Sequence, residues 1–211
     1  NKITHLVIDE QFPDTSNPWK TQAFQREFIF NGLNNAKPED YIMFSDPDEI
    51  PRPEILANLK LIKKFGIFLQ KMFCYKLNIY NPHESLWEGT RICLKKDLKS
   101  IDFLRQKVRK KNIRYPFWRI DKEKSIQLID NGGWHFNYLL EPEKISKKLK
   151  TFAHTQYNKD EFTKIEEIKK NIHEMRDLFQ RGHKYYKVQL DNTFPDYILN
   201  NQSKFNQWIK Q

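Results

Sequence analysis

The chain has 211 residues, a length typical of one domain with a sizeable core. Hydrophobic residues make up 38% of it, which argues against an intrinsically disordered chain, and the absence of an apolar run of about 18 residues argues against a membrane span in this sequence. The formal charge of +10 favours an anionic partner, such as nucleic acid, a membrane surface, a nucleotide-sugar or an acidic glycan.

The first predicted element in chain order is a buried strand at residues 3–9, which ends in an acidic residue. After a polar loop, the helical spacing of apolar side chains predicts a helix over residues 19–33. The short apolar run 41–44 predicts a buried parallel strand. This order of strand, helix and strand is typical of a crossover unit in an α/β sheet.

Farther along, apolar periodicity predicts an amphipathic helix over residues 54–65. Apolar runs rich in aromatic and β-branched residues predict strands within 67–81, 90–95 and 125–129. Proline and glycine signals delimit two more helices, at 142–157 and 160–179. Because neither an internal repeat nor a low-complexity linker interrupts the sequence, we expect one α/β domain over residues 1–211.

Two cysteines, Cys74 and Cys93, are too few for a disulfide framework. Both lie in predicted strands, so we expect them to be buried free thiols. This cysteine usage, together with the absence of a leader-like segment, predicts a cytoplasmic protein.

An acidic turn, Ser45-Asp46-Pro47-Asp48-Glu49-Ile50-Pro51, follows the predicted strand 41–44. Asp46 and Asp48 are two residues apart on an extended segment, so their carboxylates point to the same side, and Pro47 stiffens the pair. Carboxylates beyond the end of a parallel strand suit Mg²⁺ or Mn²⁺ that also binds substrate phosphates. The alternative is a solvated turn, because Asp-Pro-Asp is common in turns.

Two other segments add candidates for binding. Arg26, in the first predicted helix, has a planar guanidinium that suits a diphosphate, or it is an ordinary surface residue. His135 follows Gly132, Gly133 and Trp134 in a predicted loop, and we consider it a metal ligand, a phosphate contact, an acceptor contact or a structural histidine. The glycines either approach a ligand or make a turn. Trp134 is a sugar-stacking platform or, as the safer prediction, a core residue.

Several motifs occur together in one order: Asn17-Pro18-Trp19, Gln25-Arg26, the run from Ser45 to Glu54 and Gly132-Gly133-Trp134-His135-Phe136. In this combination the chain resembles glycosyltransferase family 17 over almost its whole length, including residues 147–158. The resemblance implies a GT-A-like fold, with a mostly parallel central sheet flanked by helices. It also implies a UDP-sugar donor, UDP-GlcNAc, and inverting transfer to a hydroxyl of a glycan acceptor.

The same resemblance implies roles for the two aspartates. Asp46 would contact the nucleotide or its metal, and Asp48 would ligate the Mn²⁺ or Mg²⁺ that bridges the two phosphates. Family members carry a further N-terminal region with the first strand and helix of the nucleotide-binding half. We therefore expect either an N-terminally incomplete chain or a uridine pocket that is built differently. Eukaryotic relatives work in the Golgi lumen behind an N-terminal anchor, which is the alternative to a cytoplasmic location.

Inverting transfer requires one carboxylate to take the proton of the attacking hydroxyl. The candidates for this base are Glu49, Glu88 and Asp130, and the sequence does not decide among them. His154, in the predicted helix 142–157, could join the site, but the favoured interpretation is an exposed or core histidine.

A basic stretch at residues 105–114 carries six positive charges and no acidic residue. With Tyr115, Phe117 and Trp118 beside it, the stretch could bind a nucleic-acid backbone and stack on bases. No known nucleic-acid module accompanies it, so we expect a solvated face or a surface that attracts an acidic glycan rather than a nucleic-acid partner. A nucleic-acid-binding module or an inactive sugar-nucleotide binder is the alternative function.

Overall fold

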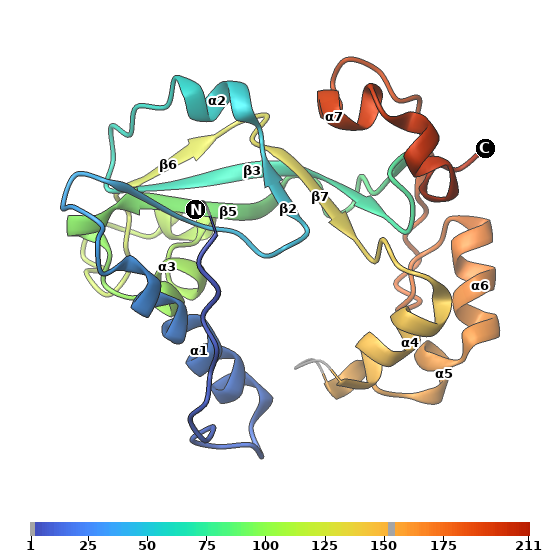
Figure 1. The fold of residues 1–211 in the computed structure, drawn as a ribbon, viewed down its shortest axis with the longest axis horizontal. Helices are drawn as coiled ribbons and strands as arrows, with labels where there is room; N and C mark the ends of the chain where they lie inside the picture. The colour runs from blue at the N-terminus through green and yellow to red at the C-terminus, as the bar shows by residue number, and fades with distance from the viewer. Residues whose placement is uncertain (1–2, 152–154) are drawn as a thin grey trace. The chain divides into compact units, whose positions relative to one another are not determined.

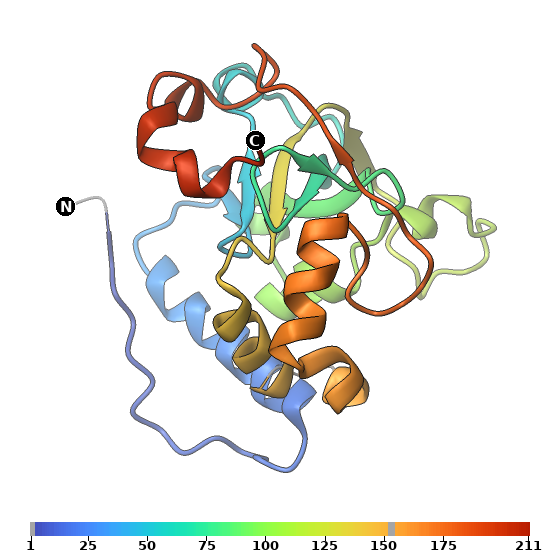
Figure 2. The same ribbon diagram turned by 90° about the vertical axis from the view of Figure 1, so that its right-hand side faces the viewer.

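The computed structural model describes residues 3–151 and 155–211, and the chain forms two compact units. Unit 1 contains the chain up to Asp46, with residues 58–68 and 88–130, and unit 2 contains residues 47–57, 69–87 and 131–211. Each unit combines helices with a sheet, as the ribbon views show (Figures 1 and 2). The predicted α/β class is therefore confirmed.

The sheet of unit 1 joins four strands. Strand β1 (Tyr41–Phe44) pairs antiparallel with β5 (Trp87–Leu94), and the first residues of β3 (Phe65–Cys74) pair in parallel with β6 (Ile126–Ile129). The helices of this unit are α1 (Pro18–Phe28), α3 (Ile101–Gln106) and the 3₁₀ segments η1 (Ile29–Leu33), η2 (Lys95–Asp97) and η3 (Lys110–Arg114).

Helix α1 begins where the sequence predicts it. The side chain of Asn17 accepts hydrogen bonds from the backbone N–H groups of Trp19 (3.1 Å) and Lys20 (3.3 Å), and Pro18 occupies the first helical position, where its missing N–H costs nothing. Helices α1 and α3 are neighbours (Figure 1), and the side chain of Glu27 links them by accepting a hydrogen bond from the backbone N–H of Asp102 at 2.6 Å. The predicted helix 19–33 is confirmed, with its last turn tightened into η1.

The predicted strand at residues 3–9 is wrong. These residues form no strand, and the side chains of Ile3 and Val7 are 79% and 64% exposed. An apolar run becomes a strand only when another strand satisfies its backbone groups, and such a partner cannot be read from local sequence. The predicted crossover unit fails with it, and β1 is antiparallel to its neighbour rather than parallel.

The predicted helix 54–65 is also too long. Helix α2 (Pro53–Ala57) ends early, and Phe65 already belongs to β3. In between, the backbone N–H of Ile62 donates to Gln127 Oε1 at 2.9 Å and that of Lys64 donates to Ser125 Oγ at 3.1 Å. Hydrogen bonds to the side chain of Gln127, in β6, and of Ser125, just before β6, thus replace helical ones, and the pairing of Phe65 with Ile126 decides the local structure.

The sheet of unit 2 places β7 (Gly133–Asn137) between two partners. It pairs antiparallel with β2 (Glu49–Pro51) and in parallel with residues 71–74 of β3. Strand β3 also pairs antiparallel with β4 (Ile79–Tyr80), which pairs antiparallel with β8 (Tyr186–Lys187). Both sheets are mixed, with antiparallel pairs prominent, so the expectation of a mostly parallel sheet is corrected.

The remaining helices belong to unit 2. They are α4 (Pro142–Thr151), η4 (Thr155–Tyr157), α5 (Asp160–Thr163), α6 (Ile165–Glu174), α7 (Asp196–Leu199) and η5 (Gln202–Trp208). Helices α4, α5 and α6 lie together (Figure 1) and bury Ile145, Leu149 and Ile168 completely. The predicted helix 142–157 is confirmed up to residue 151, and residues 152–154, with His154, lie outside the described residues. Helix α6 ends before residue 179 because Met175 adopts a left-handed conformation with φ 54°.

Within residues 3–151 and 155–211, every helix is too short or too polar to cross a membrane. Both cysteines are buried and free, as predicted, with Cys74 3% and Cys93 0% exposed.

Burial raises the pKa of both thiols to about 12, so each stays protonated and poorly nucleophilic at neutral pH. We therefore expect neither cysteine to be alkylated by iodoacetamide in the native protein at pH 8, whereas both react after unfolding in guanidinium. Mass spectrometry of the alkylated chain measures this directly. Rapid native labelling of Cys74 or Cys93 would contradict the burial of that thiol.

Candidate active site

The acidic turn is divided between the units, with Asp46 in unit 1 and Asp48 and Glu49 in unit 2. In unit 1, a carboxylate oxygen of Asp46 accepts a hydrogen bond from Arg105 Nη2 at 2.5 Å. Arg105 is only 9% exposed and also donates to the carbonyl oxygen of Gly89 at 3.1 Å. Arg105 is therefore no part of a solvated basic face, which corrects that expectation for the start of the basic stretch. It compensates the charge of Asp46 and occupies one of its oxygens.

Arg26 lies in the same unit, on α1. Its side chain is 12% exposed, with Nη1 3.9 Å from Asp102 Oδ1 and the guanidinium carbon 5.9 Å from the centre of the Phe44 ring. Arg26 is thus packed between α3 and β1 rather than extended into solvent. The ordinary surface position that the sequence left open is therefore wrong, and the diphosphate contact stays a prediction.

In unit 2, the pairing of β2 with β7 builds the candidate site. Glu49 lies opposite His135, Ile50 opposite Trp134 and Pro51 opposite Gly133. The ladder extends at one end through the backbone N–H of Phe136, which donates to the carbonyl oxygen of Asp48 at 2.9 Å. Residues directly opposite each other in an antiparallel pair point to the same face, so two distant motifs meet here.

Gly133 allows this close approach. It has φ +127°, and a Cβ built on it would collide with the carbonyl oxygen of Ile50. The glycine is therefore required by a neighbouring strand rather than by a ligand or a simple turn, as the sequence left open. His135 lies within β7 and not in a loop, which corrects the predicted position of that residue.

Asp48 and His135 form the centre of the site. Nε2 of His135 lies 3.4 Å from Asp48 Oδ1, and Nζ of Lys148, on α4, lies 3.9 Å from Asp48 Oδ2. Burial raises the pKa of the Asp48 carboxyl, but the hydrogen bond and charge of His135 and the charge of Lys148 outweigh burial and hold that pKa below its ordinary value. Asp48 is therefore a carboxylate at neutral pH.

Trp87 closes the site on one side. Its indole Nε1 donates to Glu49 Oε1 at 2.8 Å, and its ring centre lies 5.0 Å from that of His135. Nδ1 of His135 is buried and has no hydrogen-bond partner among the described residues, and the imidazole ring contacts the Trp87 indole and the Asp48 carboxylate. Sequence reasoning missed Trp87, although it considered the neighbouring Glu88, and it missed Lys148.

A pocket of about 370 Å³ opens beside Asp48. Its lining residues are Pro47, Asp48, Ile50, Phe136, Tyr138, Leu139, Leu140 and Lys148. Apolar walls with one carboxylate and one lysine suit a small ligand that has a flat or apolar part and an anionic part. The volume is within the usual range of small-molecule pockets.

Trp134, in contrast, is a core residue. It is 1% exposed, its Nε1 donates to the carbonyl oxygen of Thr193 at 3.1 Å, and the guanidinium carbon of Arg52 lies 4.3 Å from its ring centre. A sugar-stacking platform needs an open ring face, which Trp134 lacks. Of the two roles considered for it, the structure supports the core.

The three carboxylates considered as the base have different surroundings. Glu49 is 4% exposed and is the one that shares unit 2 with Asp48. Glu88 Oε2 lies 3.4 Å from Arg91 and accepts from the backbone N–H of Lys110 at 2.9 Å, so it organises the basic stretch in unit 1. Asp130 is exposed just after β6. Which of them is the base stays a prediction.

The metal prediction can be compared with the donor atoms in unit 2. Among the described residues, no three His, Cys, Asp or Glu side chains come together to hold an ion by themselves. Asp48 and His135 offer two donors 3.4 Å apart, and two ligands of one ion at about 2.1 Å each are separated by roughly 3 Å. Mg²⁺ and Mn²⁺ sites of phosphate-handling enzymes often have one or two protein ligands, with substrate phosphates completing the shell. The pair fits such a substrate-completed site.

No protein-family model, curated protein or solved structure matches this chain. The resemblance to glycosyltransferase family 17 therefore stays an expectation from the sequence motifs. Two of those motifs, the acidic turn and the tryptophan–histidine segment, are joined by the hydrogen bonds of β2 and β7.

Proposed function

We propose that the chain is an inverting, metal-dependent glycosyltransferase that moves a sugar, GlcNAc, from a UDP-sugar to a hydroxyl of a glycan acceptor. The observation that carries this proposal is the pairing of β2 with β7, which brings Asp48 within 3.4 Å of His135. These residues come from the two motifs that best support the resemblance to family 17. A GT-A-like arrangement belongs to the same proposal, supported by the mixed sheet that holds these motifs.

Each group of the site has a role in the proposed reaction. Asp48 and His135 would hold Mn²⁺ or Mg²⁺, which when bound neutralises the diphosphate of the donor. Lys148, with a side chain 39% exposed, donates to a phosphate oxygen of the leaving UDP. Trp87 acts as a positioning residue because it contacts both the Glu49 carboxylate and the His135 ring.

The apolar part of the pocket, formed by Ile50, Phe136 and Leu139, excludes water around the donor. One of Glu49, Glu88 and Asp130 takes the proton of the acceptor hydroxyl as that hydroxyl attacks the sugar carbon.

Two buried, reduced thiols suit a cytoplasmic location, which we propose with the activity.

The test is UDP release from UDP-GlcNAc in the presence of Mn²⁺. We expect Asp48→Asn, which keeps the side-chain shape and removes the charge, to lower the rate by about a hundredfold or more. The matched control is Asp196→Asn, an exposed aspartate in the same unit, which should leave the rate unchanged. A Mn²⁺ titration followed by calorimetry should show binding in the parent that is lost in Asp48→Asn.

Two outcomes would contradict parts of this proposal. Equal UDP release by Asp48→Asn and the parent would remove the metal role of Asp48. Binding of UDP-GlcNAc without release of UDP, with several glycan acceptors offered, would identify an inactive sugar-nucleotide binder instead.

A further inference from the structure

A loop of unit 1 exposes large apolar side chains at its end. Phe117 is 84% exposed, Trp118 66% and Ile120 94%, and we call these three residues the apolar tip. Scattered exposed apolar residues are normal on a protein surface, but three within four positions form a patch. Contiguous apolar surface of this kind marks an interaction site.

Hydrogen bonds hold the loop in this conformation. Nζ of Lys124 donates to the carbonyl oxygens of Arg119 (2.7 Å) and Phe117 (3.2 Å), and the backbone N–H of Arg119 donates to the carbonyl oxygen of Pro116 (3.1 Å). The guanidinium of Arg119 binds both oxygens of Asp121 at 2.7 and 2.8 Å. These bonds order the backbone of the loop before contact, which lowers the entropic cost of binding through the tip.

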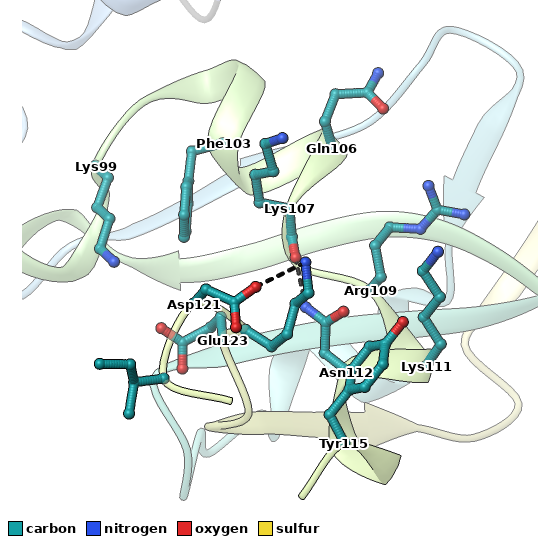
Figure 3. Close-up of a pocket in the computed structure, with 12 residues that line it drawn as sticks. Lys99, Phe103, Gln106, Lys107, Arg109, Lys111, Asn112, Tyr115, Asp121 and Glu123 are labelled. Atoms are coloured by element: carbon teal, nitrogen blue, oxygen red, sulfur yellow. Dashed lines mark hydrogen bonds and ion pairs between the residues drawn. The ribbon is translucent and has the colours of Figure 1, made fainter. Parts of the chain in front are cut away.

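Positive charge surrounds the apolar tip. Residues 107–124 contain eight lysines and arginines against two acidic residues, and both Arg119 and Lys122 already compensate Asp121. A pocket of about 570 Å³ adjoins the tip, because Ile120 is one of its lining residues. Its lining has five cationic side chains, which are Lys99, Lys107, Arg109, Lys111 and Lys122, against two carboxylates, Asp121 and Glu123, so positive charge is in excess. Figure 3 shows Lys99 on one side of this pocket and Arg109 and Lys111 on the other.

We propose that this loop docks the protein on the surface of an anionic phospholipid bilayer. Phe117, Trp118 and Ile120 enter the boundary between headgroups and acyl chains, where aromatic and aliphatic side chains are favoured. The lysines and arginines around them bind lipid phosphates, and the cationic pocket takes a headgroup. Each basic residue near such a surface adds attraction, and the cytoplasmic leaflet supplies the negative charge.

The composition of the tip favours a bilayer over single-stranded nucleic acid. Ile120 is the most exposed of the three side chains, and an aliphatic side chain offers no surface for base stacking. The rings of Phe117 and Trp118 lie edge to face, with centres 5.2 Å apart and an interplanar angle of 80°, so they form a wedge and not a row of parallel platforms. A wedge with a cationic rim complements a headgroup layer.

The test is co-sedimentation with vesicles. The full chain should bind phosphatidylcholine vesicles containing roughly 30% phosphatidylglycerol at least about tenfold more tightly than vesicles of phosphatidylcholine alone, and high salt should weaken binding. The triple variant Phe117→Ser, Trp118→Ser and Ile120→Ser should bind at least about tenfold less well. The variant Tyr197→Ser removes an aromatic side chain that is 65% exposed elsewhere and should bind like the parent.

A second measurement reports on insertion. Trp118→Phe should keep the affinity for vesicles but lose most of the blue shift in tryptophan emission that the parent shows on binding. Because all three tip residues are exposed, thermal unfolding should be the same in every variant. Three results would overturn the proposal: no binding of the parent to anionic vesicles, undiminished binding of the triple variant, or salt-sensitive binding of a single-stranded oligonucleotide in place of vesicles.

Discussion

The Gly133→Ala variant is expected to be less stable than the parent by about 3 kcal/mol, because the added methyl group has no room and the backbone is strained for any residue but glycine. The φ of +127° at Gly133 is one that residues with a Cβ rarely adopt. The new Cβ would also collide with the carbonyl oxygen of Ile50, which is backbone and cannot rotate away. Urea unfolding monitored by circular dichroism measures the loss.

A second glycine provides the control. Gly182 also has a positive φ, +77°, but a Cβ built there meets no atom within 4 Å. Gly182→Ala should therefore lower the stability by about 1 kcal/mol, which is the cost of a positive φ without any steric clash. If the two variants lose the same stability, the contact of β7 with β2 is not what requires glycine at position 133.

The Gly133 substitution also tests the proposed activity. Displacing β2 from β7 moves Asp48, whose carbonyl oxygen accepts from Phe136, away from His135. We expect Gly133→Ala to weaken Mn²⁺ binding and UDP release even at a temperature where the variant stays folded. Gly182→Ala should leave both unchanged.

Local signals in the sequence predict part of this fold. Asn17 and Pro18 mark the start of α1 because a cap acts on the next three residues only. The apolar run that becomes β3 is recognisable because a strand buried on both faces has nearly continuous apolar side chains, and the strands predicted at residues 90–95 and 125–129 largely coincide with β5 and β6. The free, buried thiols of Cys74 and Cys93 follow from the same runs.

Strand pairing lies beyond such signals. Residues 3–9 have the apolar character of a strand but form none. The short segment Glu49–Pro51 contains a glutamate and a proline, which are unfavourable in strands, and yet it pairs with β7. Residues 58–64 have the apolar spacing of a helix, but they form none, because their backbone donates hydrogen bonds to Gln127 and Ser125, more than 60 positions away. The outcome depends on contacts between distant segments, which a pattern of local periodicity does not contain.

The candidate site illustrates the same division. The turn at Asp48 and the segment at His135 each stand out in the sequence, but their 3.4 Å contact follows from the register of β2 with β7. Lys148 was one of several lysines on its helix, and only the fold shows that it is the one near the Asp48 carboxylate. Arg105 was counted with a basic stretch, yet it is buried against Asp46.

The second large effect is expected for Asp177→Asn, which should destabilise the protein by about 3 kcal/mol at pH 7. Asp177 is 4% exposed and accepts from Arg181 Nε at 2.9 Å, from Arg181 Nη2 at 2.7 Å and from the hydroxyl of Tyr185 at 3.1 Å. Removing the charge of Asp177 leaves the Arg181 guanidinium paired with Glu84 but without its buried partner. This loss of stability is at the low end of what breaking a buried ion pair costs, because the Arg181 side chain is 34% exposed.

The pH dependence of this effect has a definite sign. Burial raises the pKa of the Asp177 carboxyl, but the hydrogen bonds and charge of Arg181 outweigh burial and hold that pKa below its ordinary value of about 3.9. A lowered pKa in the folded state means that Asp177 contributes its full stabilisation above the unfolded value and loses it as the pH falls through the folded value. The difference in unfolding free energy between the parent and Asp177→Asn should therefore be constant from pH 7 to about 5 and shrink below about pH 4.

Urea unfolding of both proteins between pH 7 and pH 3 measures this difference, and Asp191→Asn is the control. Asp191 also has a lowered pKa, owing to hydrogen bonds from Thr193, but it is fully exposed on a turn, so its replacement should change stability far less. If the difference in unfolding free energy between the parent and Asp177→Asn stays constant down to pH 3, lost packing is the source of the destabilisation, and not the charge of Asp177 that Arg181 stabilises. Asp177 joins the neighbouring segments through that charge, so we expect this difference to shrink.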